Sequence, residues 1–286
     1  MMYASRKAIT RRKDLVFFGR CYQSQATTRT LSSTAGAQAA FDIDDEETSA
    51  LSNDSRSVDK HPLYPHLFQP LRLKNGALLA NRALMGSMHT GLEGTSMPRL
   101  LEWYLNKDDP SGESEDHSLQ RMATYFQERA QGGVALMVTG GISPNQAGWV
   151  APFAAQLTSE QEMIKHQVVT DAVHSVPIPI YGTHDMTSPK ICLQILHAGR
   201  YSYSPLAVSA SATKSPISPF TARALSTSGI QQTIQDFTRT AVLAQQAGYD
   251  GVEIMGSEGY LLTQFLTPRT NQRTDAYGGS FENRVR

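Results

Sequence analysis

Residues 251–286, GVEIMGSEGYLLTQFLTPRTNQRTDAYGGSFENRVR, join a strand pattern to a dense cluster of polar residues and glycines. The run from Gly251 to Gly256 is short and apolar, which predicts a buried strand. Tyr260 stands at the centre of the polar cluster, and the residues from Ser280 onward are typical of the first turn of a helix. A strand that leads directly into such a cluster indicates a functional site at its carboxyl end.

Upstream of this stretch, strand patterns alternate with helical patterns. Apolar runs predict strands at 82–86, 134–141 and 190–200, and helical periodicity predicts helices at 119–133, 159–175 and 226–248. Ser159, followed three residues later by Glu162, has the pattern of a capping box at the start of the second helix. The predicted apolar stripe of the first helix consists of Leu119, Met122, Tyr125, Phe126 and Ala130.

The order of these elements predicts an α/β protein with a parallel sheet and right-handed crossovers. Two architectures are compatible with it, a doubly wound sheet and a (β/α)8 TIM barrel. No G-x-G-x-x-G follows the first strand, so the dinucleotide fingerprint of a doubly wound sheet is absent there. Small and polar residues follow each strand instead, which favours the barrel, with about the first four β/α units present in this chain.

Composition excludes several classes of function. The 286 residues include 26 basic and 26 acidic side chains, and this neutral balance gives no support for nucleic acid as a partner. No apolar run approaches the roughly 20 residues of a membrane span. The two cysteines, Cys21 and Cys192, exclude a disulfide framework and a cysteine-rich zinc or iron–sulfur site within this chain, and they are typical of a reducing compartment.

The first sixty residues differ from the rest. Residues 1–41 contain seven Lys or Arg and one acid, Asp14, which predicts a disordered presequence of the mitochondrial type. A basic tail of a cytoplasmic protein is the alternative. Residues 42–60 are acidic and poor in large apolar side chains, which predicts a disordered linker. The ordered domain is therefore expected at 61–286.

Three segments resemble the flavin-dependent old yellow enzyme superfamily. They are NRALMGSMHTG at 81–91, LQILHAGR at 193–200, and the long motif at 251–284. The resemblance runs from about Leu67 to Arg286. It implies an FMN-binding TIM barrel that acts as an NAD(P)H-dependent flavin oxidoreductase.

Two positions make the chain most similar to the 2,4-dienoyl-CoA reductase branch of that superfamily. Met255 and Glu258 stand where classical ene-reductases place a His and a His or Asn that hold the substrate carbonyl. The branch implies reduction of enoyl-CoA or 2,4-dienoyl-CoA thioesters in fatty-acid β-oxidation. Its members carry a 4Fe-4S cluster and FAD on further segments that this chain lacks. A classical ene-reductase acting on small enones is the alternative.

The resemblance also implies roles for individual residues. Tyr260 would be the proton donor, a task that suits a phenol because its pKa near 10 keeps it protonated at neutral pH. The other reading is a core tyrosine. His197 and Arg200 would either hold the loop after the third strand or touch ligand. FMN would be bound by Ser87, Met88, His89, Gly141 and Gln194, and substrate by Thr270, Asn271, Gln272 and Arg273, although Arg273 also suits a surface ion pair.

A (β/α)8 barrel has eight strands, and only four are predicted in this chain. The sequence therefore predicts an N-terminal fragment whose partner is the missing C-terminal half. It also predicts open edges on the first and fourth strands. The alternative is a stand-alone product without catalysis, such as an interaction module.

Overall fold

The main sheet contains five parallel strands. The computed structural model describes the backbone of residues 16–18 and, with side chains, residues 61–97 and 118–286. The strand order is β1-β11-β8-β5-β4, and every neighbouring pair is parallel. The strands are β1 (Val16–Phe18), β4 (Leu84–Met85), β5 (Leu136–Ile142), β8 (Lys190–Ile195) and β11 (Gly251–Ile254).

The order of these strands distinguishes the two predicted architectures. From β4 through β5 and β8 to β11, each strand pairs with the next one along the chain, always in the same direction. A doubly wound sheet reverses its strand order at a switch point, and these four strands do not. The predicted barrel is therefore confirmed, with four consecutive β/α units of a (β/α)8 fold.

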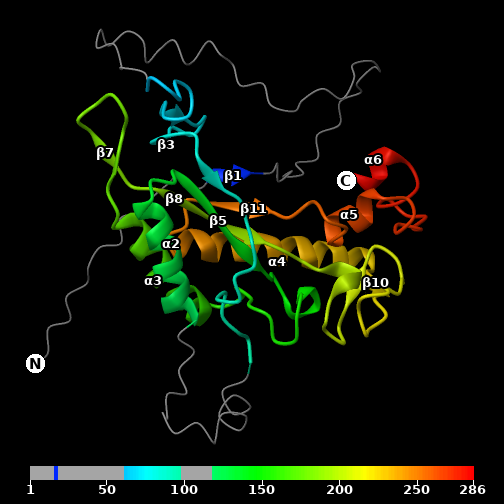
Figure 1. Ribbon diagram of the computed structural model, residues 1–286. Coiled ribbons are helices and arrows are strands. Elements are labelled where there is room, and N and C mark those ends of the chain that lie inside the picture. The colour runs from blue at the N-terminus through cyan, green and yellow to red at the C-terminus, as the bar shows by residue number, and fades with distance from the viewer. Residues whose placement is uncertain (1–15, 19–60, 98–117) are drawn as a thin grey trace, which may run out of the picture.

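Three long helices connect the strands. They are α2 (Ser118–Gln131), α3 (Glu160–His174) and α4 (Thr227–Gln246), close to the predicted bounds. Helices α2 and α3 pack against each other, and α4 runs alongside β8 and β11 (Figure 1). The predicted capping box is present: the Ser159 hydroxyl accepts from the Glu162 N–H, and the Glu162 carboxylate accepts from the Ser159 N–H.

Short elements follow the last strand. Helix α5 (Leu261–Leu266) begins directly after Tyr260, and α6 (Phe281–Arg284) begins after Ser280, whose hydroxyl accepts from the Asn283 N–H. This confirms the helical turn predicted at Ser280.

The sequence pattern did not predict the smallest elements. Strand pairs of two residues each are too short to show a period. They are the antiparallel pairs β2 (Leu71–Arg72) with β3 (Leu78–Leu79) and β6 (Ile178–Pro179) with β7 (Met186–Thr187), and the parallel pair β9 (Val208–Ser209) with β10 (Arg223–Ala224); the 3-10 turns are η2 (Gln146–Gly148) and η3 (Gly199–Tyr201).

The core lies between the sheet and its helices. All seven residues of β5 are buried, as are the five from Ile191 to Ile195 in β8. Strands covered on both faces explain the continuous apolar runs in the sequence. Four residues of the predicted stripe on α2 are buried, and Tyr125 is only partly buried.

Strand β1 differs from the disorder predicted for residues 1–41. Val16 pairs with Gly251 and Phe18 with Glu253, so β1 covers the edge of β11 that was predicted to be open. An uncovered edge exposes unpaired N–H and C=O groups, and valine and phenylalanine suit a strand that pairs with them. The rest of the predicted presequence and the linker at 42–60 lie outside the described residues.

A polar cluster ties the amino ends of β8 and β11 to α3. The Asp250 carboxylate lies 2.7 Å from His174 Nε2 and 3.3 Å from Lys190 Nζ, and it accepts from the Ile191 N–H at 3.0 Å. Burial alone would raise the pKa of Asp250. The hydrogen bond and charge of His174, the charge of Lys190 and the Ile191 N–H outweigh it, so the pKa lies below its ordinary value.

Replacing Asp250 with Asn is expected to lower the free energy of unfolding at pH 7 by about 1–2 kcal/mol, because His174 and Lys190 lose their charged partner. A carboxyl with a depressed folded pKa stabilises the protein above its unfolded pKa, and this stabilisation disappears as pH falls through the folded value. Urea unfolding should therefore show a smaller difference from wild type near pH 3 than at pH 7. The control is Asp171→Asn, which changes an exposed carboxylate on α3, the helix that carries His174. An equal difference at both pH values would refute this assignment.

Candidate active site

Gln194 joins three strands at their carboxyl ends. Its buried side chain projects from β8, and Nε2 donates to Ser87 Oγ at 2.6 Å in the loop after β4. The same nitrogen lies 3.3 Å from Glu253 Oε1 and 3.5 Å from Met255 Sδ, on β11 and directly after it. Two of the predicted flavin-contacting residues, Ser87 and Gln194, are thus in direct contact.

Gly141 supports this arrangement. A Cβ atom on Gly141 would lie 2.5 Å from Leu196 Cδ1 and 3.0 Å from Gln194 Oε1. Real Cβ atoms do not approach neighbours that closely, so the absence of a side chain lets Leu196 and Gln194 occupy their positions. The family resemblance places Gly141 among the FMN-binding residues, and the packing of Leu196 and Gln194 gives a second reason for a glycine at this position.

The loop after β4 is held by Glu93, which the sequence did not single out. Glu93 Oε1 accepts from the N–H and hydroxyl of Thr90 at 2.7 and 2.9 Å, and Oε2 accepts from the Gly91 N–H at 3.0 Å. Burial raises the pKa of Glu93, but the hydrogen bonds from His89, Thr90 and the loop backbone outweigh it and lower the pKa to about 2. The carboxylate is therefore ionised at neutral pH and fixes the loop that carries Met88 and His89, both exposed.

Tyr260 lies where β11 leads into α5. It packs with Tyr201 and Val150 against the buried side chains of Leu196 and Met255. The rings of Tyr201 and Tyr260 meet edge to face, with centroids 6.0 Å apart and planes at 75°. The Gln194 amide contacts Met255, and Tyr260 packs against the apolar cluster to which Met255 belongs, so both predicted site residues lie next to this cluster.

The Tyr260 phenol keeps its proton at neutral pH. Burial, the negative charge of Glu258 and the neighbouring Tyr201 raise its pKa above the ordinary value. Glu258 has φ 62°, a left-handed conformation that is uncommon for a residue other than glycine.

The segment predicted to contact substrate makes hydrogen bonds within the chain. The Thr270 hydroxyl donates to the Gln264 carbonyl at 2.9 Å, and Asn271 Nδ2 donates to the carbonyls of Phe265 and Tyr277, both at 2.7 Å. Both residues are buried. Gln272 has an exposed side chain, so it is the member of this segment that remains most available to a ligand.

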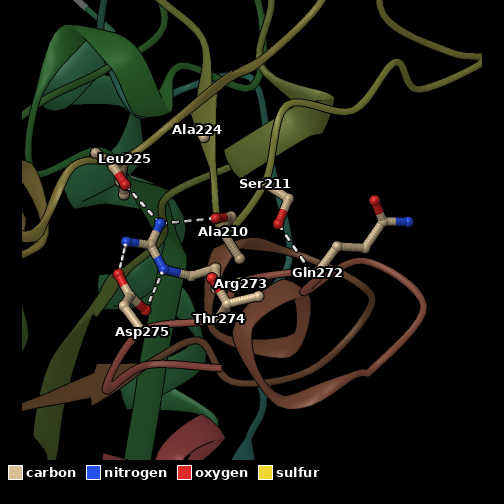
Figure 2. A pocket seen from close by; sticks show the side chains of 8 residues that line it. All are labelled: Ala210, Ser211, Ala224, Leu225, Gln272, Arg273, Thr274 and Asp275. Carbon is tan, nitrogen blue, oxygen red and sulfur yellow. Dashed lines mark hydrogen bonds and ion pairs between the residues drawn. The ribbon is translucent and has the colours of Figure 1, made fainter. Parts of the chain in front are cut away.

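Arg273 has a structural role as well. Figure 2 shows its guanidinium turned toward Asp275 and toward the backbone around Ala210 and Leu225. Nη1 donates to the Ala210 carbonyl at 2.9 Å and to the Leu225 carbonyl, and Nε donates to Asp275 Oδ1 at 3.0 Å. These residues line a cavity of about 320 Å³ together with Ser211, Ala224, Gln272 and Thr274. Most of the guanidinium donors are occupied, so Arg273 is poorly placed to meet a CoA phosphate.

His197 fits the structural alternative. It is 1% exposed, and its Nδ1 accepts from the Gly199 N–H at 3.0 Å, so the neutral ring carries its proton on Nε2. Burial lowers the pKa of His197 to about 4. A Cβ atom on Gly148 would lie 2.8 Å from the His197 ring, so the ring packs directly against η2. Arg200 donates from Nη2 to the Tyr201 hydroxyl at 3.4 Å.

Within residues 61–97 and 118–286, no cluster of three or more His, Cys, Asp or Glu side chains could hold a metal ion. No helix in the described part of the chain is long and apolar enough to span a membrane.

The residues at the strand ends fit a flavin. The Gln194 amide can both donate and accept, as the edge of a flavin pyrimidine ring requires, and the Ser87 hydroxyl lies beside it. Gly86, directly before Ser87, has open space where a Cβ atom would stand, with no atom within 4 Å. Polar groups beside open space at the carboxyl ends of barrel strands are the usual arrangement of a cofactor site.

Comparison with known proteins agrees with this arrangement. Residues 66–286 match the model of the NADH:flavin oxidoreductase / NADH oxidase family. An NADH oxidase of Thermoanaerobacter brockii is 33% identical over 230 residues, which are 78% of this chain and 30% of the relative. The 12-oxophytodienoate reductase 1 of Oryza sativa subsp. japonica is 36% identical over 176 residues, which are 57% of this chain and 43% of the relative. This chain thus spans less than half the length of these two relatives.

Two solved structures are also similar. Morphinone reductase in complex with tetrahydroNAD has a TM-score of 0.59 and 26% identity, covering 77% of this chain and 57% of its own. A complex of 2-naphthoyl-CoA reductase with 2-naphthoyl-CoA has a TM-score of 0.61 and 25% identity, covering 77% of this chain and 32% of its own.

Proposed function

The chain belongs to the NADH:flavin oxidoreductase / NADH oxidase family, and from that membership we propose that it contributes active-site residues to an FMN-dependent, NAD(P)H-dependent reductase of conjugated carbonyl compounds. One observation carries the proposal. Gln194 and the protonated phenol of Tyr260 lie at the carboxyl ends of β8 and β11, and the Gln194 amide contacts Met255, a member of the apolar cluster against which Tyr260 packs.

Each side chain has a distinct task in this proposal. Bound FMN would supply the hydride that adds to the substrate double bond. Gln194 and Ser87 would hold the flavin by hydrogen bonds, and the loop fixed by Glu93 would border it. Tyr260 would give its phenol proton to the substrate carbon that gains electron density. Its raised pKa keeps that proton in place until it is needed.

We propose an enoyl-CoA or 2,4-dienoyl-CoA thioester as the substrate. Met255 presents a thioether and Glu258 a carboxylate, and neither can donate a hydrogen bond to a carbonyl oxygen as an imidazole does unless Glu258 is protonated. The likeness to 2-naphthoyl-CoA reductase supports a CoA thioester. The relatives named for 12-oxophytodienoate and morphinone favour the alternative, a classical ene-reductase. The FAD and 4Fe-4S cluster implied by the dienoyl-CoA branch remain predictions.

A competition between substrates tests the proposal. The chain is produced alone and as a hybrid with the fifth to eighth β/α units of a relative, because the matched relatives are longer. After loading with FMN and anaerobic reduction by NADH or NADPH, re-oxidation is followed by flavin absorbance. We expect hexadienoyl-CoA to re-oxidise the flavin at least about tenfold faster than cyclohexenone. A difference of about 1.4 kcal/mol in the binding of the two transition states, about the value of one hydrogen bond, is sufficient for a tenfold difference in rate. Faster reaction with cyclohexenone would establish the ene-reductase, and no reaction with either would refute the proposal.

A further inference from the structure

The buried amide of Gln264 connects two loops of the site. Gln264 lies on α5 and is 2% exposed. Its Nε2 donates to the Gly259 carbonyl at 2.7 Å and to the Ala198 carbonyl at 3.3 Å. Its Oε1 accepts from the Arg200 N–H at 2.9 Å and from Ser209 Oγ at 2.8 Å. Both donors and both acceptor positions of the amide are therefore occupied.

Two glycines with positive φ allow this close approach. A Cβ atom on Gly199, at φ 62°, would lie 2.1 Å from Gln264 Oε1. A Cβ atom on Gly259, at φ 80°, would lie 2.8 Å from the Tyr201 hydroxyl. The Leu261 N–H also donates to the His197 carbonyl at 3.0 Å. The loop after β8 and the turn before α5 are thus interlocked around the Gln264 amide.

The carbonyl bound by Gln264 Nε2 belongs to the residue directly before Tyr260. Glycine is the least restricted residue, so Gly259 alone leaves the direction of Tyr260 poorly defined. Tyr260 occupies the cap position of α5 without a side-chain capping bond. The hydrogen bond from the Gln264 amide therefore restrains the backbone at Gly259, the residue whose own conformation is least restricted.

We propose that Gln264 is a positioning residue, which orients the Tyr260 phenol by holding the Gly259 carbonyl against the loop after β8. The chemical consequence rests on the proposed function of Tyr260. The restraint on the backbone does not, because it follows from hydrogen bonds within the chain. Gln264 is not among the residues proposed to contact flavin or substrate, since its side chain is buried.

Three variants distinguish the hydrogen bonds that Gln264 Nε2 donates from those that Oε1 accepts. Gln264→Glu keeps the size of the side chain and the bonds accepted at Oε1. Burial raises the pKa of such a carboxyl, so this variant is measured at a pH where it is ionised and has no proton to donate to the carbonyls of Gly259 and Ala198. Gln264→Met removes the bonds without adding charge. Ser209→Ala is the matched control, because it removes a bond at Oε1 and leaves the bond to Gly259 in place.

Amide hydrogen exchange of the full chain, without flavin, measures the restraint directly. We expect peptides covering 256–266 to exchange at least about tenfold faster in both Gln264 variants, while peptides from α2 and β5 keep the wild-type rate. Ser209→Ala should resemble wild type. Exchange that is unchanged at 256–266, or faster throughout the chain in both variants, would overturn the inference, since the first shows no restraint and the second a general role in folding.

The half-reactions of the FMN-loaded hybrid test the consequence for Tyr260. Re-oxidation by substrate should slow about tenfold in Gln264→Glu, while reduction by nicotinamide stays at the wild-type rate. If Tyr260→Phe slows re-oxidation and Gln264→Glu does not, the positioning role is wrong. If Tyr260→Phe itself has no selective effect, the proposed function of Tyr260 fails, and the exchange result alone decides the restraint.

Discussion

Replacing Tyr260 with Phe is expected to slow re-oxidation of the reduced flavin by a conjugated thioester by about 10²–10⁴-fold, the usual contribution of a positioned proton donor. Reduction of the flavin by nicotinamide should be nearly unchanged, because that step needs no proton from the phenol. The phenylalanine ring can keep the contact with Tyr201 and the packing against the apolar cluster of Leu196, Ala198 and Met255, so the fold should persist. Stopped-flow absorbance in the FMN-loaded hybrid resolves the two half-reactions.

Tyr201→Phe is the matched control for this experiment. It also removes one phenol from the same ring pair, but the Tyr201 hydroxyl is engaged by Arg200 and is not the proposed donor. Its effect on re-oxidation should be much smaller than that of Tyr260→Phe. Equal slowing of both half-reactions by Tyr260→Phe would mean that the residue is structural.

The re-oxidation rate of the unmodified protein should also stay flat up to about pH 9, because the pKa of Tyr260 is raised above its ordinary value near 10.

Replacing Gly140 with Ala should lower the free energy of unfolding by about 2–3 kcal/mol, the upper part of the range for overpacking a core. The added Cβ would lie 2.4 Å from Glu93 Oε1 and 2.9 Å from the Met88 carbonyl. The Glu93 carboxylate cannot swing aside freely, because Thr90 and Gly91 hold both of its oxygens. The loop after β4 must therefore move, and the change should weaken FMN binding as well as stability.

Gly86→Ala provides the comparison at the neighbouring strand end. No atom lies within 4 Å of the position its Cβ would take, so its cost in urea unfolding should stay within about 0.5 kcal/mol. If the Gly140→Ala and Gly86→Ala variants unfold at the same urea concentration, Glu93 does not hold the loop after β4.

Long periodic segments explain what could be predicted from the sequence. The stripe on α2 and the capping box of α3 specify helices whose ends agree within a few residues. Buried strands β5 and β8 show up as continuous apolar runs. The functional motif placed Gln194, Ser87 and Tyr260 correctly at the carboxyl ends of the strands, since these ends meet at one rim of a parallel barrel.

Single buried polar residues explain what could not be predicted. Glu93 and Gln264 belong to no repeating polar pattern in the sequence, so no spacing predicts that their side chains are buried. A motif is also ambiguous for Thr270, Asn271 and Arg273, whose contact with substrate stays a prediction. Their polar groups bind backbone carbonyls, and a motif does not show whether a polar side chain faces a ligand or its own chain.

The pairing of β1 with β11 has a consequence for the order of folding. It joins Val16 to Gly251, the largest separation along the chain of any pair in the sheet. Closing a longer loop costs more chain entropy, about 0.6 kcal/mol for each doubling of its length, and only three residues of β1 offset that cost. The pairs β4–β5, β5–β8 and β8–β11 each close a much shorter loop. We therefore expect strand β1 to be the last part of the sheet to form and the first to detach.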